Sequence, residues 1–185
     1  MGLTIVTGPA SEPITSAEAK LHCRVDTDDS SQDDVITDLI AAVRERCEAV
    51  ADRALITQTL KLTLDAWPAD NVIRLPRAPL VSVTTLKYRA AADGTLTTLA
   101  ADQYSVDTVS EPGRITPAYG VAWPTPRDQA VAIEVTYVAG VASGSVPKAI
   151  KERLKVAVAY CWENREQRDD EYLDRLFAPF WIGAY

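Results

Sequence analysis

The sequence lacks most of the residue patterns that mark an enzyme or a metal protein. It has one histidine, His22, and three widely spaced cysteines without a Cys-x-x-Cys pair. A histidine-based triad, a zinc site and a disulfide framework therefore lack their usual residues. No serine lies in a Gly-x-Ser-x-Gly motif. We nominate no catalytic, metal-binding or cofactor-binding residue and expect a protein that is not an enzyme.

Positive charge and long apolar runs are also scarce. Lys and Arg total 19 against 26 Asp and Glu, a net charge of -7 in 185 residues, which argues against a protein that wraps nucleic acid. No apolar run approaches the ~20 residues of a membrane helix. Residues 1–9 lack the basic and apolar parts of a signal peptide. We expect a protein that folds in a cytoplasm, without a membrane.

An acidic stretch over residues 26–34 superficially matches the start of a calcium-binding EF-hand loop. The match then fails, because Ser31 stands at the turn-glycine position and Thr37 at the position of the bidentate glutamate. We interpret the stretch as helix caps. A weak cation site shared between copies stays open as the alternative.

Apolar spacing of three and four residues predicts two long amphipathic helices. In residues 33–51 the stripe consists of Ile36, Leu39, Ile40, Val43, Cys47 and Val50. The charged residues of this segment, including Arg44 and Glu48, fall mostly outside the stripe. A capping box at Thr15 and Glu18 begins a shorter helix before it. A further helix is expected over 147–165, with Ile150, Leu154 and Cys161 on its apolar side.

Between these helices the hydrophobic period changes to two. Residues 59–67 and 131–137 alternate cleanly, as half-buried strands do. Asp93-Gly94 predicts a type I′ hairpin turn. We therefore predict an α+β fold, with N-terminal and C-terminal helices (15–51 and 147–165) flanking a mostly antiparallel β-region (55–139). Residues 1–165 form one domain in this interpretation, and 166–185 form an extended C-terminal docking tail.

Three exposed features are candidates for contact with partners. The tail carries apolar side chains that favour burial, either on its own domain or in a neighbouring subunit or partner: Leu176, Phe177, Phe180, Trp181 and Tyr185. Tyr119 and Trp123 lie in a proline-rich loop that either covers the core or contacts another subunit. Lys148, Lys151 and Lys155 share a helix side that is either a solvated face or a basic stripe toward DNA or an acidic partner.

Five segments, in order, resemble the head–tail connector family (adaptor or head-completion proteins) of long-tailed phages, prophages and gene transfer agents. They are residues 12–26, the helix end and strand over 53–68, residues 73–83, residues 111–124, and residues 135–165. The first reads EPITSAEAKLHCRVD, similar to the opening of that family. The resemblance spans about residues 3–165 and does not extend to the tail.

The resemblance implies a non-enzymatic protein of the virion, assembled in the bacterial cytoplasm, that needs no cofactor. Such connectors form a ring, usually of twelve subunits, that extends the DNA channel under the portal. The implied partners are the portal protein, neighbouring copies in the ring, and a stopper or tail-side neck protein. DNA would pass through without specific binding. The tail residues are then expected to face the portal, and Tyr119 and Trp123 to contact the ring or neck.

Other functions remain open from the sequence. The chain could be a different neck component, such as a stopper or tail-terminator. From another class, it could be a monomeric β-rich module that binds a sugar or peptide at a concave aromatic site. An enzyme is the remaining alternative, and no residues support it.

Overall fold

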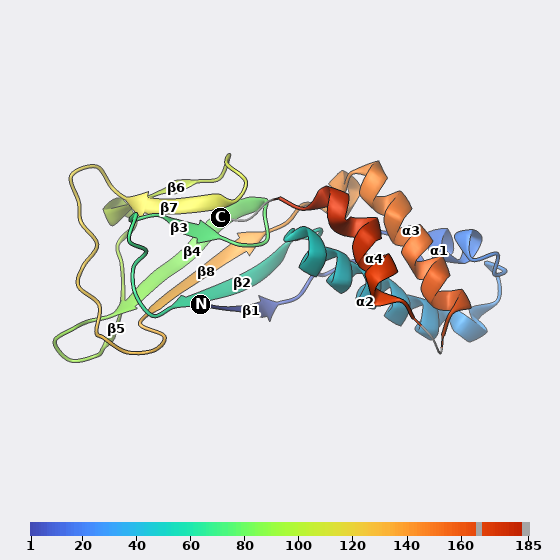
Figure 1. Ribbon diagram of the computed structural model, residues 1–185, viewed down its shortest axis with the longest axis horizontal. Helices are drawn as coiled ribbons and strands as arrows, with labels where there is room; N and C mark the ends of the chain where they lie inside the picture. The colour runs from blue at the N-terminus through green and yellow to red at the C-terminus, as the bar shows by residue number, and fades with distance from the viewer. Residues whose placement is uncertain (166–167, 183–185) are drawn as a thin grey trace. The chain divides into compact units, whose positions relative to one another are not determined.

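The computed structural model describes residues 1–165 and 168–182 (Figure 1). These residues divide into two compact units, and each is described by itself. The β unit consists of Met1–Gly8 and Thr57–Gly140. The helical unit consists of Pro9–Ile56 together with 141–165 and 168–182. Within the described residues, the chain crosses between the units three times, after residues 8, 56 and 140.

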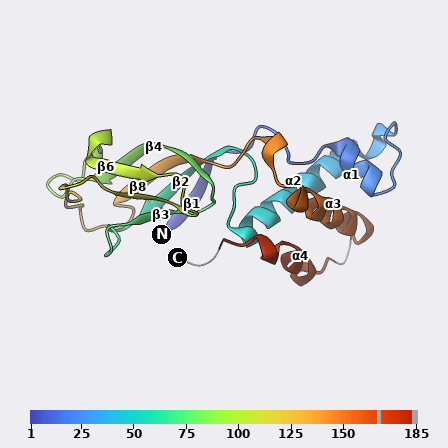
Figure 2. The same cartoon turned by 90° about the horizontal axis from the view of Figure 1, so that it is seen from above.

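The helical unit packs four α-helices around one apolar core (Figure 2). They are α1 (Ser16–His22), α2 (Asp33–Ala51), α3 (Lys148–Glu163) and α4 (Asp170–Phe177). Short 3₁₀ turns occupy Ser30–Gln32, Ser143–Ser145 and Ala178–Phe180. The predicted stripe of α2 is buried as expected from Ile36 to Cys47, and Ile150, Leu154 and Cys161 of α3 are buried in the same core.

The β unit contains two antiparallel sheets (Figure 1). The larger has the order β1 (Gly2–Thr7), β2 (Gln58–Leu64), β8 (Ile133–Ala139), β4 (Leu80–Arg89) and β5 (Leu96–Thr98). The smaller has the order β3 (Ile73–Leu75), β7 (Gly113–Pro117) and β6 (Tyr104–Asp107). A 3₁₀ turn over Ala101–Gln103 precedes β6. The predicted α+β class is confirmed.

Alternation along the strands builds the core of the β unit. Leu60 and Leu62 of β2 and Val135 of β8 are fully buried, as are Ile73 and Ile115 of the smaller sheet. One hydrogen bond and one close packing contact join the two sheets. The Tyr137 hydroxyl donates to the Pro76 carbonyl at 2.8 Å, and Gly113 leaves no room for a Cβ against the side chain of Leu80.

Two local predictions need correction, and the burial of two charged residues was not predicted. Arg44 and Glu48 are buried, although they lie outside the apolar stripe. The Asp93-Gly94 turn is not type I′, because Gly94 has a positive φ of 74° and Asp93 does not. The loop is instead closed by hydrogen bonds of Ala90 with Thr95 and Gly94. The C-terminal tail is not extended throughout, because Asp169 caps α4 by accepting from the Tyr172 amide.

Candidate interaction surfaces

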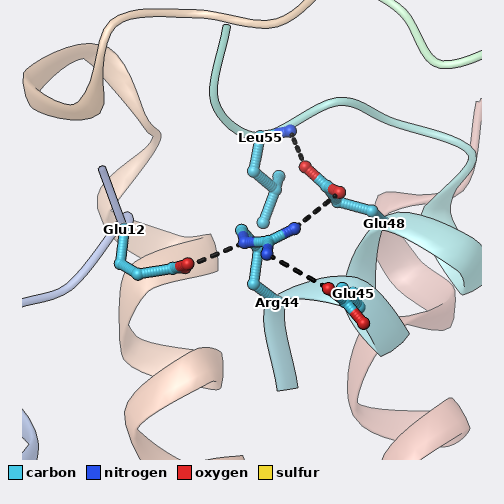
Figure 3. Close-up of polar contacts among 5 residues, drawn as sticks. All are labelled: Glu12, Arg44, Glu45, Glu48 and Leu55. Carbon is cyan, nitrogen blue, oxygen red and sulfur yellow. Dashed lines mark hydrogen bonds and ion pairs between the residues drawn. The ribbon is translucent and has the colours of Figure 1, made fainter. Parts of the chain in front are cut away.

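A buried ionic cluster organises the helical unit (Figure 3). Arg44 Nε donates to Glu12 at 2.8 Å, and its Nη1 donates to Glu48 at 3.1 Å. Its Nη2 reaches Glu45 at 3.4 Å. Burial alone would lower the pKa of Arg44, but the adjacent carboxylates, led by Glu12, hold that pKa above its ordinary value. The guanidinium therefore stays charged inside the unit, paired on three sides.

The cluster also fixes two chain segments near the crossings to the β unit. The second carboxylate oxygen of Glu48 accepts a hydrogen bond from the Leu55 amide at 2.8 Å, one residue before the first segment of the unit ends at Ile56. Glu12 lies in the segment that enters the unit at Pro9. Arg44 and Glu48 thus tie the incoming and outgoing chain to the C-terminal half of α2. Hydropathy alone did not reveal this role.

The tail packs on α2 through both charge and apolar contacts. Arg46 makes a two-point pair with Asp174, at 2.6 and 2.9 Å. Just beyond the C-terminal end of α2, Arg53 Nε donates to the Phe180 carbonyl at 3.1 Å. Leu173 completes the core from α4. The alternative in which the tail packs on its own chain is therefore observed for this part of it.

The predicted portal-facing residues lie in different environments. Leu176 and Phe177 are buried in the core of the helical unit. Phe180 is half-buried, and Trp181 is 55% exposed. Phe180 and Trp181 line a groove together with Arg53, Pro147, Ile150 and Pro179. Tyr185 lies outside the described residues.

Tyr119 and Trp123 share a loop but differ in exposure. Trp123 stacks on Trp67, with ring centroids 4.4 Å apart and an angle of 8° between the planes. Its indole nitrogen donates to the Asn71 carbonyl at 3.3 Å, and that of Trp67 donates to the Pro124 carbonyl at 2.7 Å. Tyr119 is fully exposed. Trp123 therefore helps to hold the loop in place, and Tyr119 is the side chain that it presents to solvent.

The three lysines of α3 do not form a uniform surface. Lys148 is exposed and Lys151 is half-buried. Lys155 pairs with Glu152 at 3.0 Å and with Glu18 of α1 at 3.8 Å. Hydrogen bonds from Thr15 keep the pKa of Glu18 below its ordinary value, and the backbone amide has the largest effect. The positive charges of Lys155 and Lys151 lower this pKa further. At least Lys155 thus neutralises charge within its own chain.

The acidic loop before α2 is organised around a lysine. Lys20 is buried, and its ammonium donates to the carbonyls of Thr27 at 3.3 Å and Asp29 at 2.8 Å and pairs with Asp33. Asp29 caps the 3₁₀ turn through the Ser31 amide. The Lys20 ammonium thus satisfies two carbonyls of the loop and neutralises Asp33. Within residues 1–165 and 168–182, no group of three or more His, Cys, Asp or Glu side chains could hold a metal.

The edges of the larger sheet are a surface that the sequence analysis missed. All six residues of β1 are exposed, including Leu3, Ile5 and Val6. On the other side, β5 pairs only with Lys87–Arg89 of β4. Periodicity could not identify β1, because a strand that buries neither face has no half-buried alternation. Its signal is β-branched composition alone.

Among the described residues, no helix is both long and apolar enough to cross a membrane.

The fold defines an α+β protein with a four-helix unit and a unit of two antiparallel sheets, and solved structures share it. One match is a chain of the virion of a native gene transfer agent (GTA) particle, 22% identical, covering 100% of this chain and 97% of that chain, with a TM-score of 0.81. A chain from the neck of an empty GTA particle, computed with C6 symmetry, is 21% identical with the same coverage and a TM-score of 0.81. A chain from the neck of a native GTA particle, computed with C12 symmetry, is 23% identical over 100% of this chain and 97% of that chain, with a TM-score of 0.70.

These likenesses show that the chain shares its fold with chains of GTA virion and neck structures, and gene transfer agents are among the particles named by the sequence resemblance. No protein-family model and no curated protein matches the chain.

Proposed function

We propose that this chain is a structural, non-enzymatic protein of the neck of a phage-like particle. The observation that carries the proposal is the full-length likeness to chains of GTA virions and necks, at TM-scores of 0.70 to 0.81. Coverage of 97% of those chains means that both units, rather than a shared fragment, take part in the likeness.

Within the neck, the proposed role is that of an adaptor ring of twelve copies between the portal and the next neck protein. Closed rings require a heterologous interface, in which two different surfaces of one chain meet. The ring would extend the DNA channel, and a net charge of -7 suits a wall along which DNA slides without being held.

Among the described members of the predicted portal-facing set, Phe180 and Trp181 have side chains that are exposed enough to contact the portal. Leu176 and Phe177 are already buried in their own unit. The groove of Phe180 and Trp181 has an apolar lining with Arg53 beside it, and aromatic side chains commonly dominate the energy of an interface. Tyr119 is the proposed contact within the ring or to the tail-side neck protein, since it is fully exposed.

The test is co-sedimentation of the purified protein with the portal ring encoded beside it. We expect the wild-type chain to sediment with the portal and Trp181→Ala to lose most of that binding. Val109→Ala, which alters another exposed apolar residue (91% exposed), is the matched control and should bind as wild type. Point variants are preferable to removing the chain after Asp170, because that truncation would also delete Leu173 and Phe177 from the core.

The possible results distinguish the portal anchor, the adaptor role and the neck function. If Trp181→Ala binds as well as wild type, the tail is not the portal anchor, although the adaptor role stands. If the wild-type chain does not bind the portal but is found in particles, it acts elsewhere in the neck, as a stopper or tail-terminator would. If it is absent from particles, the neck function is wrong.

A further inference from the structure

The edge strand β1 and residues 80–86 of β4, which β5 leaves uncovered, carry no charged side chain. The whole of residues 1–11 contains none. An exposed strand edge invites pairing with another chain, and soluble proteins usually guard such an edge with charges, proline or bulges. In this protein, the features that interrupt edge pairing are bulges. They lie between Ile5 and Thr7 in β1, and between Leu80 and Ser82 and between Val83 and Thr85 in β4.

The β4 edge is open over most of its length. Residues 80–86 pair with β8 on one side, and β5 reaches only Lys87–Arg89 on the other. Beyond that hairpin, the Leu99 amide bonds to the Leu86 carbonyl, and no backbone bond among the described residues joins 81–85 to a segment on that side. Val81 is 50% exposed, and Ser82 and Thr84 are exposed.

The two open edges lie at the same level of the sheet and run in opposite directions. One row across the sheet contains Thr4, Lys61, Thr136 and Thr85, and the next contains Ile5, Leu60, Tyr137 and Val83. Every neighbouring pair from β1 through β2 and β8 to β4 is antiparallel. Two strands, β2 and β8, lie between these edges, and three successive antiparallel pairings make β1 and β4 antiparallel to each other. A second copy placed beside the first therefore continues the antiparallel pattern without a break.

We propose that β1 of one copy of this chain pairs with the open edge of β4 in the next copy, so that the larger sheet runs on from subunit to subunit. The occupant is a second copy because one chain carries both complementary edges, and neither edge bears a charge that would repel the other. Pairing would bring the exposed Ile5, on the core-facing side of the sheet, beside the β4 end of the neighbouring core. Pairing of β1 with β1 would be two-fold and would stop at a dimer.

This inference rests on the proposed ring, because a β1–β4 contact is heterologous and closes only if repeated rotation brings the last copy to the first. The bulges on both edges are compatible with it, because they bend and twist strands, and a curved sheet can close where a flat one would extend as a filament.

The test uses the full-length chain and measures molar mass by sedimentation across concentration. Ile5→Lys places a charge on the β1 edge and Val81→Lys places one on the β4 edge. Val109→Lys, on an exposed loop of the same unit, is the control. We expect wild type and Val109→Lys to assemble at high concentration and each edge variant to stay monomeric. Mixed in equal amounts, the two edge variants should form a dimer, because one intact edge of each kind remains.

A dimer of Val81→Lys alone would indicate a β1–β1 contact and would overturn the proposal, as would assembly of Ile5→Lys like wild type. A wild-type chain that stays monomeric at every concentration also overturns it. Circular dichroism checks folding of the variants. If either fails to fold, amide hydrogen exchange of the wild-type assembly decides, because a β1–β1 dimer slows exchange in residues 2–7 alone and the proposed pairing slows it in residues 2–7 and 81–85. Incorporation of Ile5→Lys into particles would contradict the β1–β4 pairing but would agree with the proposed neck function.

Discussion

Arg44 and Glu48 show how far one charged pair can depart from a hydropathy pattern. On α2 they lie four residues apart, as in a surface ion pair, but both are only 4% exposed. The sequence could not predict this burial, because two of the groups that bind the pair lie outside the helix. Glu12 precedes α1, and the Leu55 amide follows α2. Only the folded chain brings them together.

The burial of Arg44 leads to a prediction about stability. Replacing Arg44 with Met leaves the carboxylates of Glu12 and Glu48 without their shared counter-charge, and breaking a buried pair from one side typically costs about 3–5 kcal/mol. We expect Arg44→Met to lower the free energy of unfolding by about that amount in urea denaturation. Arg175→Met is the control, since the side chain of Arg175 is 65% exposed and pairs loosely with Glu171 at 3.6 Å. It should cost less than about 1 kcal/mol. Equal effects of the two variants would contradict the structural role of the cluster.

At the scale of elements, periodicity was a good guide to helices and strands that bury one face. It identified α2, α3, β2 and β8, whose apolar side chains meet a core. It failed for β1 and α4. The first buries no face in a single copy, and the second is an eight-residue helix followed by Pro179. The sequence analysis assigned the apolar residues of α4 to a tail that favours burial. It could not predict the ion pair that anchors α4, because Arg46 and Asp174 are 128 positions apart in the chain.

Burial of α4 predicts different costs for two aromatic residues of the tail. Phe177 is fully buried, so Phe177→Ala should lower the free energy of unfolding by about 3–5 kcal/mol, the usual cost of such a cavity. Trp181 is 55% exposed, so Trp181→Ala should cost less than about 1 kcal/mol. Chemical denaturation of both variants measures this. If both variants were nearly neutral, α4 would not belong to the cooperative helical unit.

The capping box of α1 adds a prediction about pH. The Thr15 amide donates to Glu18 at 2.8 Å, and this contact favours the charged carboxylate and lowers its pKa. A lowered pKa in the folded state stabilises the fold above the ordinary value of 4.5, and this contribution is lost as the pH falls through the folded-state pKa.

Glu18→Gln should therefore reduce stability at pH 7, by about 1 kcal/mol for a helix cap, and should make little difference at pH 2. Urea midpoints of the variant and wild type at both values measure the effect. A loss of the same size at pH 2 would show that the charge of Glu18 is not its cause. Glu171→Gln, which removes an exposed ion pair with Arg175, controls for a general effect of charge.

At the scale of the whole molecule, the chain builds two cores from interleaved segments. The sequence predicted the order helix, strands, helix. It did not predict that β1 would join the sheet from the N-terminal side of α1, so that both units are discontinuous in sequence. Such a division depends on contacts between distant residues, such as Gly2 with Thr63, which no local pattern records.

Two separate cores predict that damage to one unit leaves the other protected. A Cβ at Gly113 would overlap the side chain of Leu80, so Gly113→Ala must displace the strand or its neighbour, at a typical cost of about 1–3 kcal/mol. We expect amide hydrogen exchange to accelerate in β2, β4 and β8 of this variant and to remain unchanged in α2 and α3, since locally cooperative units open independently. Arg44→Met should show the reverse pattern. If each variant instead raises exchange in both units equally, the chain unfolds as one cooperative body, and the three crossings transmit the loss of either core to the other.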